Sequence, residues 1–195
     1  MRSVLWGARA DELWSWVSAQ RFEVGSARFS VSAGRGRPFT ASSWLTRTLS
    51  VDENSQHVGA SSVVAEMKSL GPRAYAIMGG TFHPGGTDLV IRVGTAHPDN
   101  AATAATHRST SARLKSGLSD EYARGALNGL VSGLNTFPLP AGTLTIDVGA
   151  SDPVDSSNEA FRVAAKLLLA AITLPRSSAR GRFEQSLRSE WTWLG

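Results

Sequence analysis

The stretch from Val154 to Ile172, VDSSNEAFRVAAKLLLAAI, constrains the fold most, because its start signal and its helical period agree. Ser156 is placed to cap a helix, and Glu159, three residues on, completes a capping box. Apolar residues then recur at three- and four-residue steps, and Pro175 follows. The stripe consists of Phe161, Ala164, Ala165, Leu168 and Ile172. We predict a helix here that buries one face and serves as scaffold.

A second helix is predicted from Ser119 to Leu134, with Ser119 as its cap and two acidic residues in its first turn. Its apolar positions are Tyr122, Ala126, Leu130 and Leu134. Glycines also recur every four residues, at Gly125, Gly129 and Gly133. Each costs about 1 kcal/mol relative to alanine inside a helix. We therefore expect another backbone to pack closely against this face.

Several runs have the composition or the alternation of β-strands. They are Ala27–Ala33, Trp44–Val51, Ala74–Phe82, Asp88–Thr95 and Gly142–Val148. The link His83-Pro84-Gly85-Gly86 has turn chemistry, so the third and fourth runs are predicted to form a β-hairpin.

Three other segments complete the chain. Helical spacing indicates an amphipathic helix from Ala8 to Gln20 and a shorter one from Ser61 to Leu70. The segment from His97 to Ser116 is either a long loop or contains a short helix from Asn100 to Thr106.

These elements predict an α+β fold, a two-layer sandwich in one compact domain over residues 1–195. Two halves, 1–72 and 73–175, are an option, followed by a docking tail over 176–195. TLSVD at Thr48 echoes TLTID at Thr143, and a Ser-Ser pair follows each threonine after thirteen residues. The echo raises duplication of a βα unit as an alternative to chance.

The residues from Asp120 to Ile172 resemble domain IV of the elongation factor G family of translocation GTPases. The matching residues are Glu121-Tyr122, Gly129, the strand LTIDV, and Val154-Asp155-Ser156-Ser157 with Ala160, Phe161 and Ala164. The resemblance implies a four-stranded sheet with two helices on one face and a left-handed crossover. The chain has no GxxxxGK[ST] motif, and Ser151-Asp152-Pro153 occupies the turn where the family carries a tip histidine. The resemblance therefore implies a fold without a GTPase activity.

The composition sets broad limits on function. The chain contains no cysteine, which excludes disulfides and thiolate metal sites. No run approaches the 18 apolar residues of a membrane span, and we expect a soluble cytoplasmic protein with no membrane contact. The net charge is +4, with three lysines and seventeen arginines. This balance permits phosphate contacts and is equally compatible with a solvated basic surface.

The loop Gly34-Arg35-Gly36-Arg37 is the most RNA-like feature, because glycines admit a ligand and guanidinium groups hold phosphate. Aromatic residues flank it, namely Phe29, Phe39 and Trp44. The alternative is a hairpin turn with solvated arginines. We rank first a non-enzymatic binding module or assembly subunit whose partner is RNA or a ribonucleoprotein. Its expected phosphate contacts are Arg35, Arg37, Arg176, Arg180 and Arg182.

A protein–protein scaffold or homo-oligomer is the second hypothesis, because tryptophan is enriched at interface hot spots. The expected interface residues are Trp6, Trp191 and Trp193, unless these rings fill a core. The third hypothesis is an enzyme with a site assembled in space around His83, His97 or His107. No histidine pair has metal-ligand spacing, so we expect no metal, no cofactor and no catalytic residue. Asp152 and Asp155 form either an acid/base pair or, as we prefer, a turn and a helix cap.

Overall fold

Nine strands and two helices make up the part of the chain that the computed structural model describes, which is residues 19–24, 27–34, 36–51, 58–59, 61–69, 74–96, 103–106 and 113–173, with residues 181 and 185. The elements are β1 (Ala19–Val24), β2 (Ala27–Ala33), β3 (Ser43–Ser50), β4 (Ser61–Ser69), β5 (Tyr75–Pro84), β6 (Asp88–Thr95), β7 (Thr103–Thr106), β8 (Arg113–Ser116), α1 (Asp120–Gly133), β9 (Gly142–Ser151) and α2 (Asn158–Thr173). The predicted α+β class is confirmed. Neither helix in these ranges is long and apolar enough to cross a membrane.

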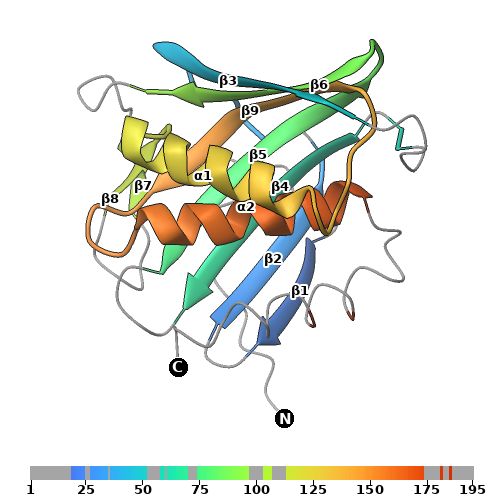
Figure 1. Cartoon of the computed structure of the whole chain (residues 1–195). Helices are drawn as coiled ribbons and strands as arrows, with labels where there is room; N and C mark the ends of the chain where they lie inside the picture. Colours follow the sequence, from blue (N-terminus) through green and yellow to red (C-terminus); the bar gives the residue numbers. More distant parts are fainter. Residues whose placement is uncertain are drawn as a thin grey trace.

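All nine strands belong to one mixed sheet. Seven follow the order β1-β2-β4-β5-β9-β6-β3, while β8 pairs with the end of β9 and β7 pairs with β8. Strands from residues 1–72 and from residues 73–175 therefore share the sheet. Both helices lie on one face of it, so the molecule has two layers there (Figure 1).

The core lies between the helices and this sheet face, which we call the helix face. Alternate residues of β5, β9 and β6 point into it. The largest of them, Phe82, Leu144, Ile146, Leu89 and Ile91, are fully buried. From α2 the whole predicted stripe is buried, and so are Val163, Leu167 and Leu169. The helix is therefore enclosed on more than the one face that its sequence pattern predicts.

The strands predicted to form a hairpin, β5 and β6, do not pair, so that prediction is wrong. β9 lies between them, antiparallel to β5 and parallel to β6. The turn between them is nevertheless built on Gly85 and Gly86, whose φ angles are 143° and 80°. The parallel pair β6 and β9 is connected through α1. This crossover is left-handed, whereas connections between parallel strands of one sheet are nearly always right-handed (Figure 1).

The helix predicted from Ser61 to Leu70 is wrong, because Ser61–Ser69 forms β4. Val63, Ala65 and Met67 point into the main core, while Val64 belongs to a second cluster on the other face. β4 pairs with β2 and β5 and buries apolar residues on both faces, so its sequence lacks strict alternation. A short apolar run of this kind does not distinguish a strand from a buried helix turn.

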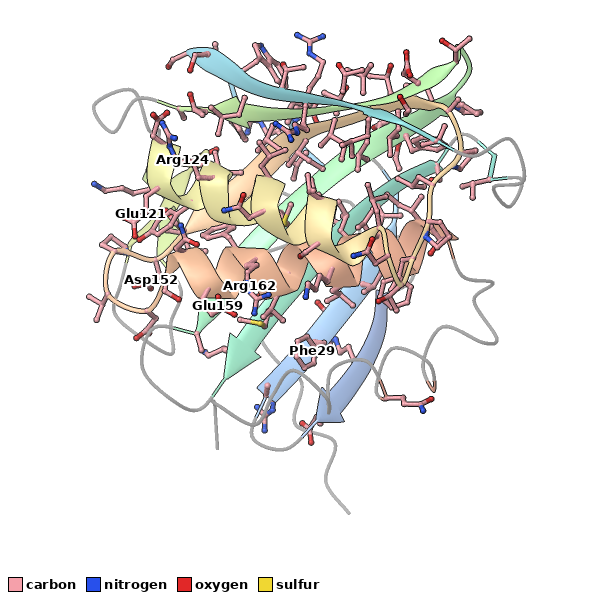
Figure 2. The ribbon with its side chains drawn as sticks, in the orientation of Figure 1. Phe29, Glu121, Arg124, Asp152, Glu159 and Arg162 are labelled. Atoms are coloured by element: carbon pink, nitrogen blue, oxygen red, sulfur yellow. The ribbon has the colours of Figure 1, made fainter. Side chains whose placement is uncertain are left out.

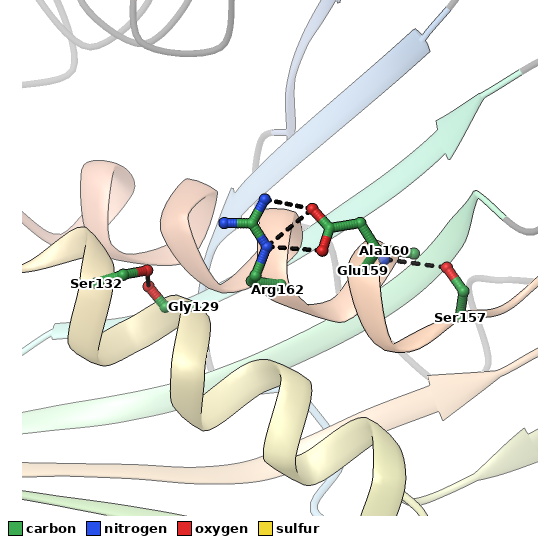
Figure 3. Close-up of polar contacts among 6 residues, drawn as sticks. All are labelled: Gly129, Ser132, Ser157, Glu159, Ala160 and Arg162. Carbon is green, nitrogen blue, oxygen red and sulfur yellow. Dashed lines mark hydrogen bonds and ion pairs between the residues drawn. The ribbon is translucent and has the colours of Figure 1, made fainter. Parts of the chain in front are cut away.

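The helix α2 begins later than its capping pattern predicts. Its first residue is Asn158, and the Ala160 N–H donates to Ser157 Oγ at 3.2 Å, so Ser157 is the cap rather than Ser156. Glu159 does not close a capping box, since its carboxylate bonds the guanidinium of Arg162 (Figure 3). Serine is a good cap at either position, and the two adjacent serines made the sequence signal ambiguous.

The close packing predicted for the glycines of α1 is confirmed. A Cβ at Gly125 would lie 2.4 Å from the Asn158 carbonyl oxygen, and one at Gly129 would lie 2.2 Å from the Arg162 carbonyl oxygen. Contacts advance in the same direction along both helices, so α1 and α2 are parallel. The cap is also confirmed, since the Tyr122 N–H donates to Ser119 Oγ at 3.3 Å.

Other predictions near the ends of elements need correction. The proposed βα repeat is absent from 43–69, since the Ser61-Ser62 pair begins a strand, and β3 is an edge strand whereas β9 is central. Within the predicted helix 8–20, residues 19 and 20 belong to β1, and the remainder lies outside the described residues. Within the alternative helix 100–106, residues 103–106 form β7.

Candidate functional site

Most of the residues predicted to bind a partner lie outside the described part of the chain. These are Arg35, Arg176, Arg180, Arg182, Trp6, Trp191 and Trp193. Arg37 is described, and its side chain is exposed. Of the aromatic residues around it, Phe29 is buried in the core, Phe39 is half-buried and Trp44 is exposed. The RNA-like composition of this region therefore combines core and surface residues.

Arg37 lies on a segment that crosses the sheet. The Gly34 N–H donates to the Ser62 carbonyl on β4 at 2.9 Å, and the Phe39 N–H donates to the Asp147 carbonyl on β9 at 2.8 Å. The chain passes from β2 to β3, and Figure 1 shows it behind the sheet, away from the helices. A Cβ at Gly94 of β6 would lie 3.2 Å from Phe39 and Ala41, which places this segment against that face. The alternative of a β2–β3 hairpin is wrong.

The face away from the helices, which we call the open face, carries exposed side chains on β3 and β6. Leu45 pairs with Val93, which is buried on the helix face, so the neighbours Trp44, Thr46 and Arg92 point to the open face. Trp44 is 38% exposed. Its partner across the ladder is Gly94, and Arg92 lies two residues before Gly94 on the same face of β6. The Arg92 Cζ atom lies over the ring, 4.7 Å from its centroid, as a cation–π pair.

Hydroxyl groups continue across the open face from this pair. Thr46 and Thr48 of β3 are exposed, and Thr145 of β9 pairs with Thr81 of β5, both half-buried. The Ser62 and Thr81 hydroxyls are hydrogen-bonded at 2.9 Å. This half of the open face therefore offers neutral donors and acceptors beside the exposed Arg92.

The other end of the open face is closed by a small core. It consists of Val64, Tyr75, Ile77, Leu114, Val148 and Ala150. The Tyr75 hydroxyl donates to Glu66 Oε1 at 3.3 Å, and the Ser30 hydroxyl donates to Glu66 Oε2 at 3.2 Å. Burial, and then the negative charge of Glu66, raise the pKa of the Tyr75 hydroxyl well above its usual value. The phenol is therefore neutral and structural.

A shallow hollow lies near the first turns of both helices. It is a shallow cavity of about 180 Å³ between β8, α1 and the turn after β9, and its lining includes Lys115, Ser119, Tyr122 and Pro153. Helix N-termini attract anions. Here carboxylates already lie in the first turn of each helix, since α1 has Asp120 and Glu121 there and α2 has Glu159. Figure 2 shows Glu121 and Asp152 at this end. We therefore do not assign this hollow to phosphate.

The turn after β9 is structural. Asp152 is buried, and its Oδ1 atom accepts the Val154 N–H at 2.8 Å and the Asp155 N–H at 3.1 Å, which confirms the predicted turn. The Asp155 carbonyl accepts the Tyr75 N–H at 2.8 Å. The side chain that caps α2 is that of Ser157, so the cap predicted for Asp155 is wrong. The Asp152 carboxylate therefore stabilises the turn, and Asp155 joins it to β5 through its backbone carbonyl.

The described residues contain no group of three or more histidine and acidic side chains placed to hold a metal ion. His83 is exposed on β5, and His97 and His107 lie outside the described residues. Comparisons of this chain with family models, with curated proteins and with solved structures found no match.

The sequence reasoning missed Arg92. The sequence could have predicted that Arg92 is exposed, because it lies between Ile91 and Val93, and alternation along β6 turns it away from the core. The sequence could not have predicted the contact with Trp44, because that contact depends on the pairing of β3 with β6 across 48 residues of chain. The exposed stack of Trp44 and Arg92, with the hydroxyls beside it and Arg37 on the crossing segment, is the candidate site.

Proposed function

We propose that the protein is a non-enzymatic binding module whose open face binds RNA, alone or within a ribonucleoprotein. The observation that carries the proposal is the exposed Trp44–Arg92 stack on the sheet face opposite α1 and α2. Aromatic rings and guanidinium planes are the surfaces on which proteins hold nucleobases.

The charges on this face support the proposal. Arg37 and Arg92 are exposed there, and both are able to bond phosphate oxygens. All three carboxylates of α1 and α2 are instead in the first turns of these helices, at Asp120, Glu121 and Glu159. An approaching polyanion is therefore attracted to the open face and repelled from the start of the helices.

The order of strands supports the expected relationship to domain IV of elongation factor G. The resemblance implies a sheet of four strands, whereas this sheet has nine, so the support comes from one part of it: the adjacent strands β4-β5-β9-β6, with α1 and α2 on one face and a left-handed crossover. This likeness supports the fold assignment alone, because one fold serves many functions. A cytoplasmic location, where RNA is accessible, is part of the same proposal.

A fluorescence titration with a structured RNA tests the proposal. We expect micromolar binding that weakens on the order of a thousandfold between 50 and 200 mM salt if six or more phosphates are contacted. The double variant Arg37→Ala, Arg92→Ala should bind more weakly, with a salt slope lower by about two. The control is Arg124→Ala, which removes an exposed charge from α1, on the other side of the sheet. The absence of salt-sensitive binding in the micromolar range eliminates the proposal.

A protein-interaction subunit is the alternative, and β3 favours it. It is the last strand of the seven-strand path, and six of its eight residues are exposed, at positions 43, 44, 46, 47, 48 and 50. An edge strand of this kind accepts another strand. Light scattering discriminates, since a dimer at tens of micromolar protein that dissociates on Thr46→Pro favours this alternative. A strict monomer argues against self-association.

A further inference from the structure

The environment of the Trp44–Arg92 stack limits the form of RNA that it is able to bind. Arg92 is exposed, and it forms no ion pair with a carboxylate of the described residues. Its Cζ atom lies over the indole ring, 4.7 Å from the ring centroid. Because both Trp44 and Arg92 are exposed, the pair is accessible to a second flat group.

The surroundings favour a nucleobase in that position. Thr46 and Thr48 are exposed on the same face of β3, two residues apart, and their hydroxyls both donate and accept hydrogen bonds. The only acidic residue on β6, Asp88, is four positions from Arg92, which is about 13 Å along a strand. Along the described residues of β3 and β6, a sugar–phosphate chain beside the stack therefore meets hydroxyl groups before it meets a carboxylate.

Base stacking requires a free π-face. In a duplex the faces of each base are covered by its neighbours, so only an unpaired base is able to lie on the guanidinium or on the indole. We infer that the Trp44–Arg92 stack takes an unpaired nucleobase, so that the face binds single-stranded RNA in preference to duplex RNA. This inference rests on the function proposed above and adds the class of ligand to it.

The test compares two probes on the full chain by fluorescence anisotropy at 50 mM salt. One probe is a labelled 12-nucleotide RNA without self-complementarity, and the other is the same RNA annealed to its complement as a blunt duplex. We expect the single strand to bind at least about tenfold tighter, since stacking of one base contributes roughly 5- to 100-fold in affinity.

Two variants separate stacking from charge. Arg92→Lys keeps the charge but removes the planar group, and Trp44→Leu keeps an apolar side chain but removes the ring. Each should weaken single-strand binding about 5- to 100-fold and change duplex binding little. Arg124→Lys on α1 is the matched control and should bind as the wild type does. Thermal unfolding close to wild type for both variants establishes that the fold is intact.

The outcomes distinguish this inference from the proposal on which it rests. Salt-sensitive binding in which the duplex binds as tightly as the single strand, or in which Arg92→Lys matches the wild type, overturns the stacking inference and leaves RNA binding in place. No binding of either probe overturns both. Preferential single-strand binding that both variants weaken supports both.

Discussion

The two faces of the sheet use the same strands for different purposes. On β9, Leu144 and Ile146 are fully buried beneath the helices, whereas their neighbours Thr143 and Thr145 are half-buried on the open face. On β6, Ile91 is buried and Arg92 is exposed. The helix face therefore supplies the free energy of folding, and the open face carries the polar groups that are accessible to a partner.

The division between the faces is not constant along β9. Gly80 pairs with Ile146 and Gly79 with Val148, so Asp147 is the extra residue between these two pairs and forms a β-bulge. Beyond the bulge, Val148 and Ala150 belong to the small core of the open face. One strand therefore contributes to two cores, and the open face is accessible only over the part that precedes the bulge.

Adjacent residues of β9 provide the strongest test of this division. Ile146→Ala leaves a cavity in the main core and should lower the free energy of unfolding by about 4 kcal/mol. Thr145→Ala, one residue earlier on the half-buried open face, should cost less than about 1 kcal/mol. Urea denaturation of both variants is the measurement. Equal losses would contradict the assignment of separate functions to the two faces.

A second test concerns the packing of the helix layer. Gly129→Ala places a methyl group 2.2 Å from the Arg162 carbonyl, and α1 and α2 must move apart. We expect a loss of about 3 kcal/mol in unfolding free energy, although alanine alone favours a helix by about 1 kcal/mol.

The control for this variant is Gly59→Ala, because a Cβ at Gly59 meets nothing within 4 Å. It should change the stability by less than about 0.5 kcal/mol. Wild-type stability of Gly129→Ala in chemical denaturation would show that the helices are not held at this distance.

The third test is at the turn where β9 of the sheet leads into the helix layer. The Ser156 hydroxyl donates to the Tyr75 carbonyl and accepts the Asp152 N–H, both at 2.8 Å and both buried. Ser156→Ala leaves these groups unpaired and should cost about 2 kcal/mol. Ser157→Ala removes only the cap of α2 and should cost about 1 kcal/mol. Thermal unfolding ranks the two, and the reverse order would restore Ser156 as the cap.

The sequence predicted the elements whose signals are local. The α1 cap at Ser119, the glycine contacts of α1, the buried stripe of α2 and five strand segments all depend on residues within a few positions of each other. These predictions hold because capping, helical period and strand alternation are short-range effects.

The errors arose where distant segments decide the structure. The helix predicted at 61–70 is a strand because β2 and β5 flank it, and the predicted hairpin is split by β9, which comes 47 residues after β6 ends. In LTIDVGA the alternation of apolar residues continues through Asp147, so nothing local reveals the bulge. The candidate site has the same origin, because pairing of β3 with β6 brings Trp44 to Arg92.

The fourth test concerns the buried end of the open face. The raised pKa of Tyr75, caused first by burial and then by Glu66, means that the folded protein holds the phenolic proton more tightly than the unfolded chain does. The stabilisation from this group is complete below pH 10, the ordinary pKa of tyrosine, and is lost as the pH rises above it.

Tyr75→Phe removes the 3.3 Å hydrogen bond to Glu66 and should cost about 1 kcal/mol at pH 7. It should also remove part of the alkaline destabilisation, so the stability difference between wild type and variant shrinks between pH 9 and 11 in urea titrations. A difference between wild type and Tyr75→Phe that stays constant over this range would mean that the phenol is open to water, and that the small core does not close this end of the open face.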